Sequence, residues 1–226
     1  MTNKTTELTN LHPDILKFQN DLRKRYATEN KAVKPDQILF VGSSLMEIFP
    51  IARFQEEQQL GLDKVIYNRG IRATTTADLL AHMDTLIFDL QPSKIFMNIG
   101  TNDIGFNVPK EDYLNNYAEI LDEIHARLPK TTVYLMAYYP INVTASFGED
   151  HHEHRALYAH RSNALYAAAS ADVAQLAREH DAEFINVNAG LTDADGDLRT
   201  DLTFDGAHML PQGFQIVLEN MMPYLK

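Results

Sequence analysis

The chain has 226 residues, of which 45% are hydrophobic and 23% are charged, and it contains no cysteine. This composition is that of an ordinary globular protein, and without cysteine the chain has no disulfide, thiolate nucleophile or cysteine-based zinc site. A formal net charge of −11 at pH 7, without a long run of lysine or arginine, argues against a nucleic-acid-binding protein.

The length suits one sizeable core, and we expect a single domain over residues 1–226. No internal repeat, low-complexity tract or Pro/Gly linker divides the chain, and no apolar stretch is long enough to span a membrane. The first ten residues, MTNKTTELTN, are polar and lack the basic start and apolar core of a secretory signal. We therefore expect a cytoplasmic protein.

The first predicted element is a helix over residues 14–26, where apolar side chains recur at helical spacing. Five later segments are rich in β-branched and aromatic residues and predict strands, at residues 37–41, 64–67, 94–99, 132–139 and 183–187. Several of these strands are apolar on both faces. That pattern is typical of a parallel sheet covered by helices on both sides.

Amphipathic helical stripes separate and follow the predicted strands, at residues 75–87, 109–128, 162–180 and 211–224. The first stripe opens on Thr75 and Asp78, whose spacing is that of a capping box. Pro109 and Pro211 suit the first turn of a helix.

Alternating strands and helices form right-handed βαβ units. We therefore predict an α/β fold, a three-layer α/β/α sandwich with a five-stranded parallel, flavodoxin-like sheet. Residues 141–154 form the longest irregular stretch, and we expect a loop over the active site there because loops of that length are often functional.

Ligands of such sheets bind outside the carboxyl ends of the strands, and three polar motifs follow predicted strands at that edge. The motifs are Gly42-Ser43-Ser44, Asn68-Arg69-Gly70 and Gly100-Thr101-Asn102-Asp103. Because parallel strands all end on one side, we expect these motifs to converge.

The motifs supply the groups that acyl transfer needs. Ser44 offers a hydroxyl nucleophile, and its own N–H, the N–H of Gly70 and the amide of Asn102 are suitable donors to an oxyanion. His208 offers a base, and Asp205 offers a carboxylate that would fix its tautomer. Each residue alone has an ordinary explanation, as a turn, a cap or a loop hydrogen bond, but their joint occurrence in this order favours a catalytic site.

Four blocks in this order resemble those of the SGNH, or GDSL-like, hydrolases. They are Gly42-Ser43-Ser44-Leu45, Asn68-Arg69-Gly70-Ile71, Gly100-Thr101-Asn102-Asp103 and Asp205-Gly206-Ala207-His208, and they span about four-fifths of the chain. The chain is most similar to the members that resemble platelet-activating-factor acetylhydrolase.

The resemblance implies a serine esterase that cleaves small, short-acyl carboxylic esters without a metal or organic cofactor. It implies that Ser44 is the nucleophile, that His208 is the base and that Asp205 orients it. It also implies that Gly70 and Asn102 donate to the oxyanion, together with the N–H of Ser44.

Two positions depart from the family pattern. Ser43 stands where the family usually has aspartate, which removes a local charge and leaves open an alternative, a catalytically silent SGNH-like domain that binds carbohydrate or protein. Arg72 stands where small residues are common in the family. We interpret Arg72 as a substrate-binding residue for an anionic or polyhydroxyl group.

Other types of site fit less well. His151, His152 and His154 match no metal-site spacing, and the acidic residues 193–197 do not match a calcium-binding loop, so we predict no metal. The chain has neither the Gly-x-Ser-x-Gly of α/β-hydrolases nor a complete nucleotide-binding motif. The expected partner is a small-molecule ester and not nucleic acid, no membrane span is expected, and a homo-oligomer is left open.

Overall fold

One five-stranded sheet forms the centre of the computed structural model, which describes residues 11–147 and 158–226. Its strands are β1 (Ile38–Gly42), β2 (Ile66–Asn68), β3 (Lys94–Asn98), β4 (Thr132–Met136) and β5 (Glu183–Ile185). They lie in the order β2-β1-β3-β4-β5, and every neighbouring pair is parallel. The predicted α/β fold with a flavodoxin-like parallel sheet is therefore confirmed.

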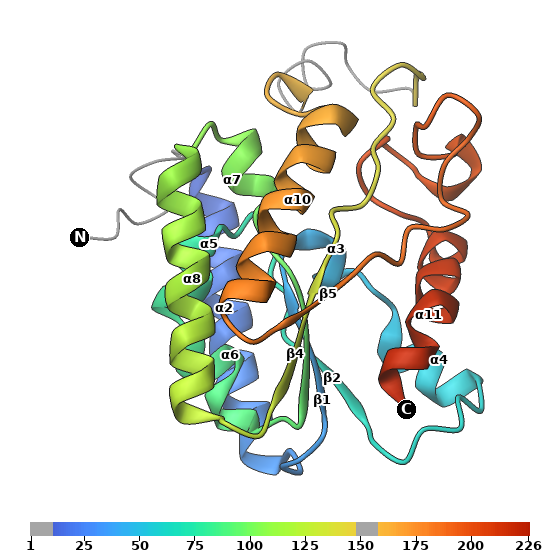
Figure 1. Cartoon of the computed structure of the whole chain (residues 1–226). Helices are drawn as coiled ribbons and strands as arrows, with labels where there is room; N and C mark the ends of the chain where they lie inside the picture. Colours follow the sequence, from blue (N-terminus) through green and yellow to red (C-terminus); the bar gives the residue numbers. More distant parts are fainter. Residues whose placement is uncertain (1–10, 148–157) are drawn as a thin grey trace.

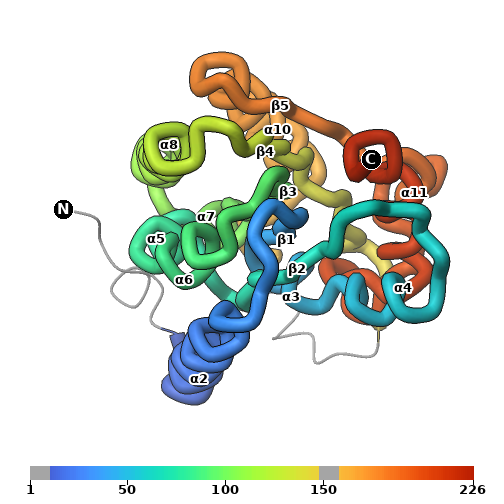
Figure 2. Tube along the Cα trace, turned by 90° about the horizontal axis from the view of Figure 1, so that it is seen from below, coloured from blue at the N-terminus to red at the C-terminus, as the bar shows by residue number. Residues whose placement is uncertain are grey.

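Helices cover both faces of this sheet, which gives three layers (Figure 1, Figure 2). One face is covered by α2 (Pro13–Glu29), α5 (Thr76–Ala81), α6 (Met83–Leu86), α8 (Lys110–Arg127) and α10 (Asn163–Glu179). The other face is covered by α3 (Ser44–Glu47), α4 (Ile51–Glu57) and α11 (Pro211–Leu225). The short helix α7 (Thr101–Gly105) follows β3.

The central strand β1 shows why both faces need this cover. Ile38 and Phe40 pack into the cluster beneath α11, whereas Leu39 and Val41 pack into the cluster beneath α8. All four side chains are fully buried. Because successive side chains of a strand point to opposite faces, an apolar run of this kind stabilises the sheet only between two helical layers.

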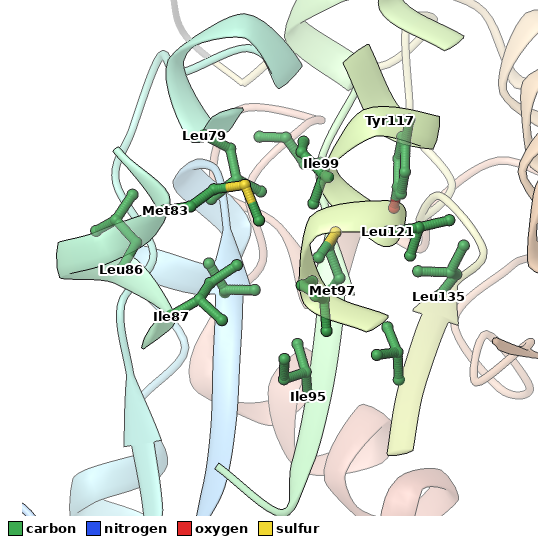
Figure 3. Packing of buried hydrophobic residues seen from close by; sticks show 14 of the residues in the cluster. Leu79, Met83, Leu86, Ile87, Ile95, Met97, Ile99, Tyr117, Leu121 and Leu135 are labelled. Atoms are coloured by element: carbon green, nitrogen blue, oxygen red, sulfur yellow. The ribbon is translucent and has the colours of Figure 1, made fainter. Parts of the chain in front are cut away.

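The capping box predicted at Thr75 and Asp78 is present at the start of α5. The predicted continuous helix is wrong, however, because it breaks at His82 into α5 and α6. The apolar side chains of the stripe still pack against the sheet (Figure 3): Leu79, Met83, Leu86 and Ile87.

Strand β4 ends at Met136, three residues before the predicted end. The N–H of Ala137 still donates to the Ile185 carbonyl at 2.9 Å. At Tyr138 the backbone bonds to side chains instead: its N–H donates to Oγ of Ser170 at 3.0 Å, and its carbonyl accepts from Nδ2 of Asn188 at 2.8 Å. The extended segment therefore leaves the sheet although its residues favour strands.

The long predicted loop over residues 141–154 is described only as far as residue 147, so His151, His152 and His154 lie outside the described residues. Within the described ranges, no helix combines the length and the apolar character that crossing a bilayer requires.

Candidate active site

Two short helices deliver polar residues to the carboxyl edge of the sheet (Figure 1). Ser44 is the first residue of α3, directly after β1 and the single residue Ser43. Asn102 lies in the first turn of α7, just after β3. Strands β1 and β3 are hydrogen-bonded neighbours, so their following residues begin from adjacent points of one edge.

Ser44, Asp205 and His208 form one connected set of hydrogen bonds. Nε2 of His208 lies 3.0 Å from Oγ of Ser44, and Nδ1 of His208 lies 2.6 Å from Oδ2 of Asp205. In this arrangement the imidazole can accept the hydroxyl proton while the carboxylate holds its tautomer and stabilises the imidazolium. The fold thus brings together residues that lie at opposite ends of the sequence.

The Asp205 carboxyl is kept ionised by its surroundings. Burial alone would raise its pKa, but the hydrogen bond and charge of His208, with the N–H groups of His208 and Ala207, outweigh burial and lower the pKa. An ionised carboxylate beside Nδ1 favours a proton on that nitrogen and leaves Nε2 as the acceptor. The Phe204 ring stacks on the imidazole, with centroids 5.8 Å apart and planes 12° apart, and covers one of its faces.

The turn that carries Asp205 and His208 is fixed from both sides. Oγ1 of Thr203 donates to the His208 carbonyl at 2.7 Å and accepts the N–H of Gly206 at 2.9 Å. The N–H of Asn142 donates to the Gly206 carbonyl at 2.8 Å. These bonds hold the imidazole against Ser44 without a contribution from regular secondary structure.

The carboxamide of Asn102 is held at both of its ends. Its Nδ2 donates to the Thr74 carbonyl at 2.9 Å, and its Oδ1 accepts from Nη2 of Arg161 at 3.2 Å. An amide nitrogen carries two hydrogens, so one remains for a further acceptor. The position of the Asn102 carboxamide is therefore compatible with its predicted role as a donor to the oxyanion.

Gly70 has a different environment from the one that an oxyanion donor needs. Its N–H donates to Oδ1 of Asn68 at 2.8 Å, and it is not among the residues that line the cavity beside Ser44. A Cβ at Gly70 would overlap the backbone of Met46 and Glu47. These contacts favour a packing role for Gly70, which lets the loop lie close against α3, over the predicted role as an oxyanion donor.

Ala73 lies where Gly70 was expected. It lines the same cavity as Ser44 and Asn102, and its N–H has no hydrogen-bond partner among the described residues. Its φ of 57° is left-handed, which is uncommon for a residue with a Cβ. Sequence reasoning missed it because alanine gives no signal of a left-handed turn, and glycine three positions earlier does.

A cavity of about 760 Å³ opens beside Ser44 and His208. Its wall includes the apolar side chains of Ile48, Phe106 and Phe204. Arginine side chains line it as well. The volume lies within the range of small-molecule sites, and the mixture of apolar and polar walls is typical of them.

Arg72 lines this cavity, but its charge is already paired. Its Nε donates to Oε2 of Glu47 at 2.8 Å, and its backbone N–H donates to the same oxygen at 2.7 Å. Hydrogen bonding to Glu47 raises the pKa of the guanidinium above its usual value. The pairing weakens the interpretation of Arg72 as an anion-binding residue; contact with a polyhydroxyl group stays a prediction.

Ser43, which replaces the usual aspartate of the family, is buried between β1 and α3. Its N–H donates to the Asn98 carbonyl at 3.3 Å, and its carbonyl accepts the N–H groups of Met46 and Glu47. A carboxylate does occur one helical turn later, at Glu47, where it binds the Arg72 loop. A charged group is therefore present in α3, at a different position.

Asp103 is a buried carboxyl beside Asn102 that sequence reasoning leaves without a role. Its oxygens accept the N–H of Thr76 at 3.1 Å and the Thr76 hydroxyl at 2.6 Å. Burial raises the pKa of Asp103 to about 7, although the bonds from Thr76 oppose this shift. Because Thr76 opens α5, Asp103 ties α7 to the N-terminus of α5.

In residues 11–147 and 158–226, no group of three histidine, aspartate or glutamate side chains is arranged to hold a metal ion. The acidic turn at residues 193–197 is closed by its own bonds. Oδ1 of Asp193 accepts the N–H groups of Asp195 and Asp197 at 3.0 and 3.1 Å.

Comparison with known proteins gives a family match for most of the chain. A model of the GDSL-like lipase/acylhydrolase family matches residues 51–216. The matched range contains Ala73, Asn102, Asp205 and His208, and it begins shortly after Ser44. No curated protein sequence matches the chain.

Solved structures share the fold over nearly the whole chain. A Streptococcus pneumonia protein assigned as a platelet activating factor has a TM-score of 0.83 and 32% identity, over 99% of this chain and 100% of its own. A GDSL-like lipase from Bacteroides thetaiotaomicron has a TM-score of 0.70 and 21% identity, over 90% of this chain and 96% of its own.

A catalytic variant of an acetylxylan esterase from Geobacillus stearothermophilus has a TM-score of 0.63 and 17% identity, over 86% of this chain and 96% of its own. At that identity, as for the lipase, the likeness concerns the fold alone. With the family match over well over half of its length, and the first of these structures over nearly all of it, this chain belongs to the GDSL-like lipase/acylhydrolase family and is a carboxylic ester hydrolase.

Proposed function

We propose that this protein is a serine esterase that cleaves small carboxylic esters of short, acetyl-like acyl groups through an acyl-enzyme on Ser44. The observation that carries the proposal is the 3.0 Å contact between Nε2 of His208 and Oγ of Ser44, with Asp205 on the other ring nitrogen. A domain that only binds carbohydrate or protein has no chemical need for this connected set.

In the acylation step, Nε2 of His208 takes the hydroxyl proton as Oγ of Ser44 attacks the ester carbonyl carbon. The oxyanion that forms accepts hydrogen bonds from the N–H of Ser44, the N–H of Ala73 and the amide of Asn102. The N–H of Ser44 is available because the first residue of a helix has no partner within it. The alcohol then leaves with the proton from His208, and the acyl group stays on Ser44.

In the deacylation step, water gives a proton to His208 and attacks the acyl carbon. The same donors hold the second oxyanion, and Oγ of Ser44 leaves with the proton that His208 returns. Asp205 stabilises the imidazolium in both steps. The products are the free acid and the original hydroxyl.

A comparison supports the short acyl group. The Geobacillus stearothermophilus relative of similar fold is an acetylxylan esterase, an enzyme of acetyl esters by its name. Its catalytic variants replace a serine, and an aspartate and a histidine three positions apart, which is the spacing of Asp205 and His208. The alcohol part of the substrate would then occupy most of the cavity of about 760 Å³.

Hydrolysis of p-nitrophenyl acetate, butyrate and octanoate by the wild type and Ser44→Ala tests the proposal. We expect the wild type to prefer acetate and the variant to lose several orders of magnitude in kcat, as other serine hydrolases do without their nucleophile. A fluorophosphonate should label Ser44, which peptide mass spectrometry would show. Equal rates for the two folded proteins would reject the nucleophile, and no turnover of any ester by the wild type would favour a binding domain.

A further inference from the structure

We propose that Arg161 is a positioning residue, which orients and polarises the Asn102 carboxamide for oxyanion binding. This inference rests on the proposed esterase function and adds to it a side chain that acts through Asn102. Arg161 comes from the segment just before α10, far in sequence from every motif of the site.

The first argument concerns the orientation of the amide. Oδ1 of Asn102 faces a guanidinium donor, and Nδ2 faces the carbonyl acceptor of Thr74. Turned by half a rotation, the amide would place its NH₂ against the cation and its oxygen against the carbonyl, so both contacts would be lost. Because arginine keeps its proton in proteins, it can only donate, and it fixes the oxygen side. The remaining hydrogen of Nδ2 is then the one that an oxyanion beside Ser44 can accept.

The second argument is that the fold provides space for this guanidinium. A Cβ at Gly105 would overlap Cζ and Nη2 of Arg161, so the bare glycine backbone is what lets the group lie against α7. Asn102 belongs to the same short helix. At the other end, the N–H of Arg161 donates to the Tyr158 carbonyl at 3.1 Å, and the next residue, Ser162, caps α10. The side chain therefore joins the start of α10 to α7.

The third argument concerns the strength of the donor. A cation at Oδ1 draws electron density towards the oxygen and leaves the hydrogens of Nδ2 more positive, so hydrogen bonds linked through the amide reinforce one another. Negative charge on the substrate oxygen develops only in the transition state. Arg161 should therefore lower the barrier to acylation and have little effect on substrate binding.

The test is a double-mutant cycle with p-nitrophenyl acetate. Removing one oxyanion donor typically costs about 100- to 1000-fold in kcat, which is the loss expected for Asn102→Ala. Arg161→Met keeps the length of the stem without the donors, and we expect a smaller loss in kcat, about 10- to 100-fold, with KM within about twofold of the wild type. In the Asn102→Ala background the same change should alter kcat by less than about twofold, because the amide through which Arg161 acts is absent.

Two further variants and one control test whether the position and the charge of the Arg161 guanidinium cause the effect on kcat. Gly105→Ala displaces the guanidinium while Arg161 is present, and should reproduce the loss in kcat. Arg161→Lys restores a cation and should recover part of the activity. Arg127→Met is the matched control, because Arg127 pairs with Asp84 at 2.7 Å and does not line the cavity, and it should keep the wild-type kcat. Thermal unfolding of each variant checks that it is folded.

Several results would overturn the inference. They are a wild-type kcat for Arg161→Met, an equal loss with and without the Asn102 side chain, or a rise in KM at unchanged kcat, which would instead indicate direct contact with substrate. If the wild type hydrolyses esters and one of these results is found, only the inference about Arg161 fails. If the wild type hydrolyses no ester, the proposed function fails with it. The two failures are therefore distinguishable.

Discussion

Ala73 holds a left-handed backbone, a conformation that costs a residue with a side chain about 1–2 kcal/mol. The surroundings keep it there. The N–H of its neighbour Arg72 is bound by Glu47 of α3, and the carbonyl of Arg72 accepts from Nε2 of Gln19 of α2 at 2.9 Å. The loop that presents the proposed oxyanion donor is thus fixed by two helices, one on each side of the sheet.

Paired substitutions test the packing role of Gly70 and the backbone strain at Ala73. Ala73→Gly keeps the N–H and removes the left-handed strain, so we expect the wild-type kcat and a gain of up to about 1 kcal/mol in the free energy of unfolding. Gly70→Ala forces a Cβ into α3, and we expect a loss of about 1–3 kcal/mol. Urea denaturation and ester kinetics measure both. Full stability of Gly70→Ala would show that this glycine has no packing role.

At the scale of elements, Asp103 connects two helices that begin at different strand ends. It lies in the first turn of α7 and accepts the N–H of Thr76, the first residue of α5. A helix N-terminus favours a charged carboxylate, but burial of Asp103 disfavours the charge more strongly. The result is a carboxyl with a pKa of about 7 in the folded protein.

This carboxyl should make folding less favourable as the pH rises. In the unfolded chain it loses its proton near the ordinary value of 3.8, whereas the folded protein keeps the proton up to about 7. Between these values the folded state binds more protons, so the free energy of unfolding decreases with increasing pH across that window.

Asp103→Asn removes the titrating group, and its free energy of unfolding should therefore decrease less than that of the wild type between about pH 4 and about pH 7. Urea unfolding at a series of pH values measures the two slopes. Parallel slopes would mean that Asp103 titrates alike in the folded and unfolded states.

The long elements and the convergence of the site are predictable from sequence. The stripe over residues 109–128 becomes α8 because several helical turns bury one apolar face. Ser44 and Asn102 line the same cavity because parallel strands end on one edge of the sheet, and this holds however the side chains pack.

Other features depend on contacts that no local pattern encodes. Helices α3 and α7 have four and five residues, too few to show a periodicity, although they carry Ser44 and Asn102. Arg161 reaches Asn102 only because the segment before α10 brings its guanidinium against α7, and Ala73 presents its N–H only because the loop turns left-handed. These residues were therefore beyond sequence reasoning.

At the scale of the whole molecule, two core tyrosines have opposite hydrogen-bonding states. Both are buried, and Figure 3 shows Tyr117 among the apolar side chains of the core. The hydroxyl of Tyr138 donates to the Ile99 carbonyl at 2.9 Å, whereas the hydroxyl of Tyr117 has no partner among the described residues. A buried hydroxyl without a partner costs about 1–3 kcal/mol.

Tyr117→Phe should therefore raise the free energy of unfolding of the protein, by about 1 kcal/mol, because it removes only the unpaired hydroxyl. Tyr138→Phe is the matched comparison and should lower the free energy of unfolding by about 1 kcal/mol, since the Ile99 carbonyl loses its donor. Denaturant titrations of the three proteins measure the difference. Destabilisation by Tyr117→Phe would indicate a partner for its hydroxyl, such as a buried water.

The contact between Ser44 and His208 joins residues 164 positions apart, one at the start of the short helix after the first strand and the other in the turn before the last helix. In a chain still being synthesised, or in one cut before residue 205, the proposed nucleophile Ser44 therefore has no histidine base beside it. Under the proposed mechanism, ester turnover reports only molecules in which the segments of Ser44 and His208 have come together, and it can serve as an assay of completed folding.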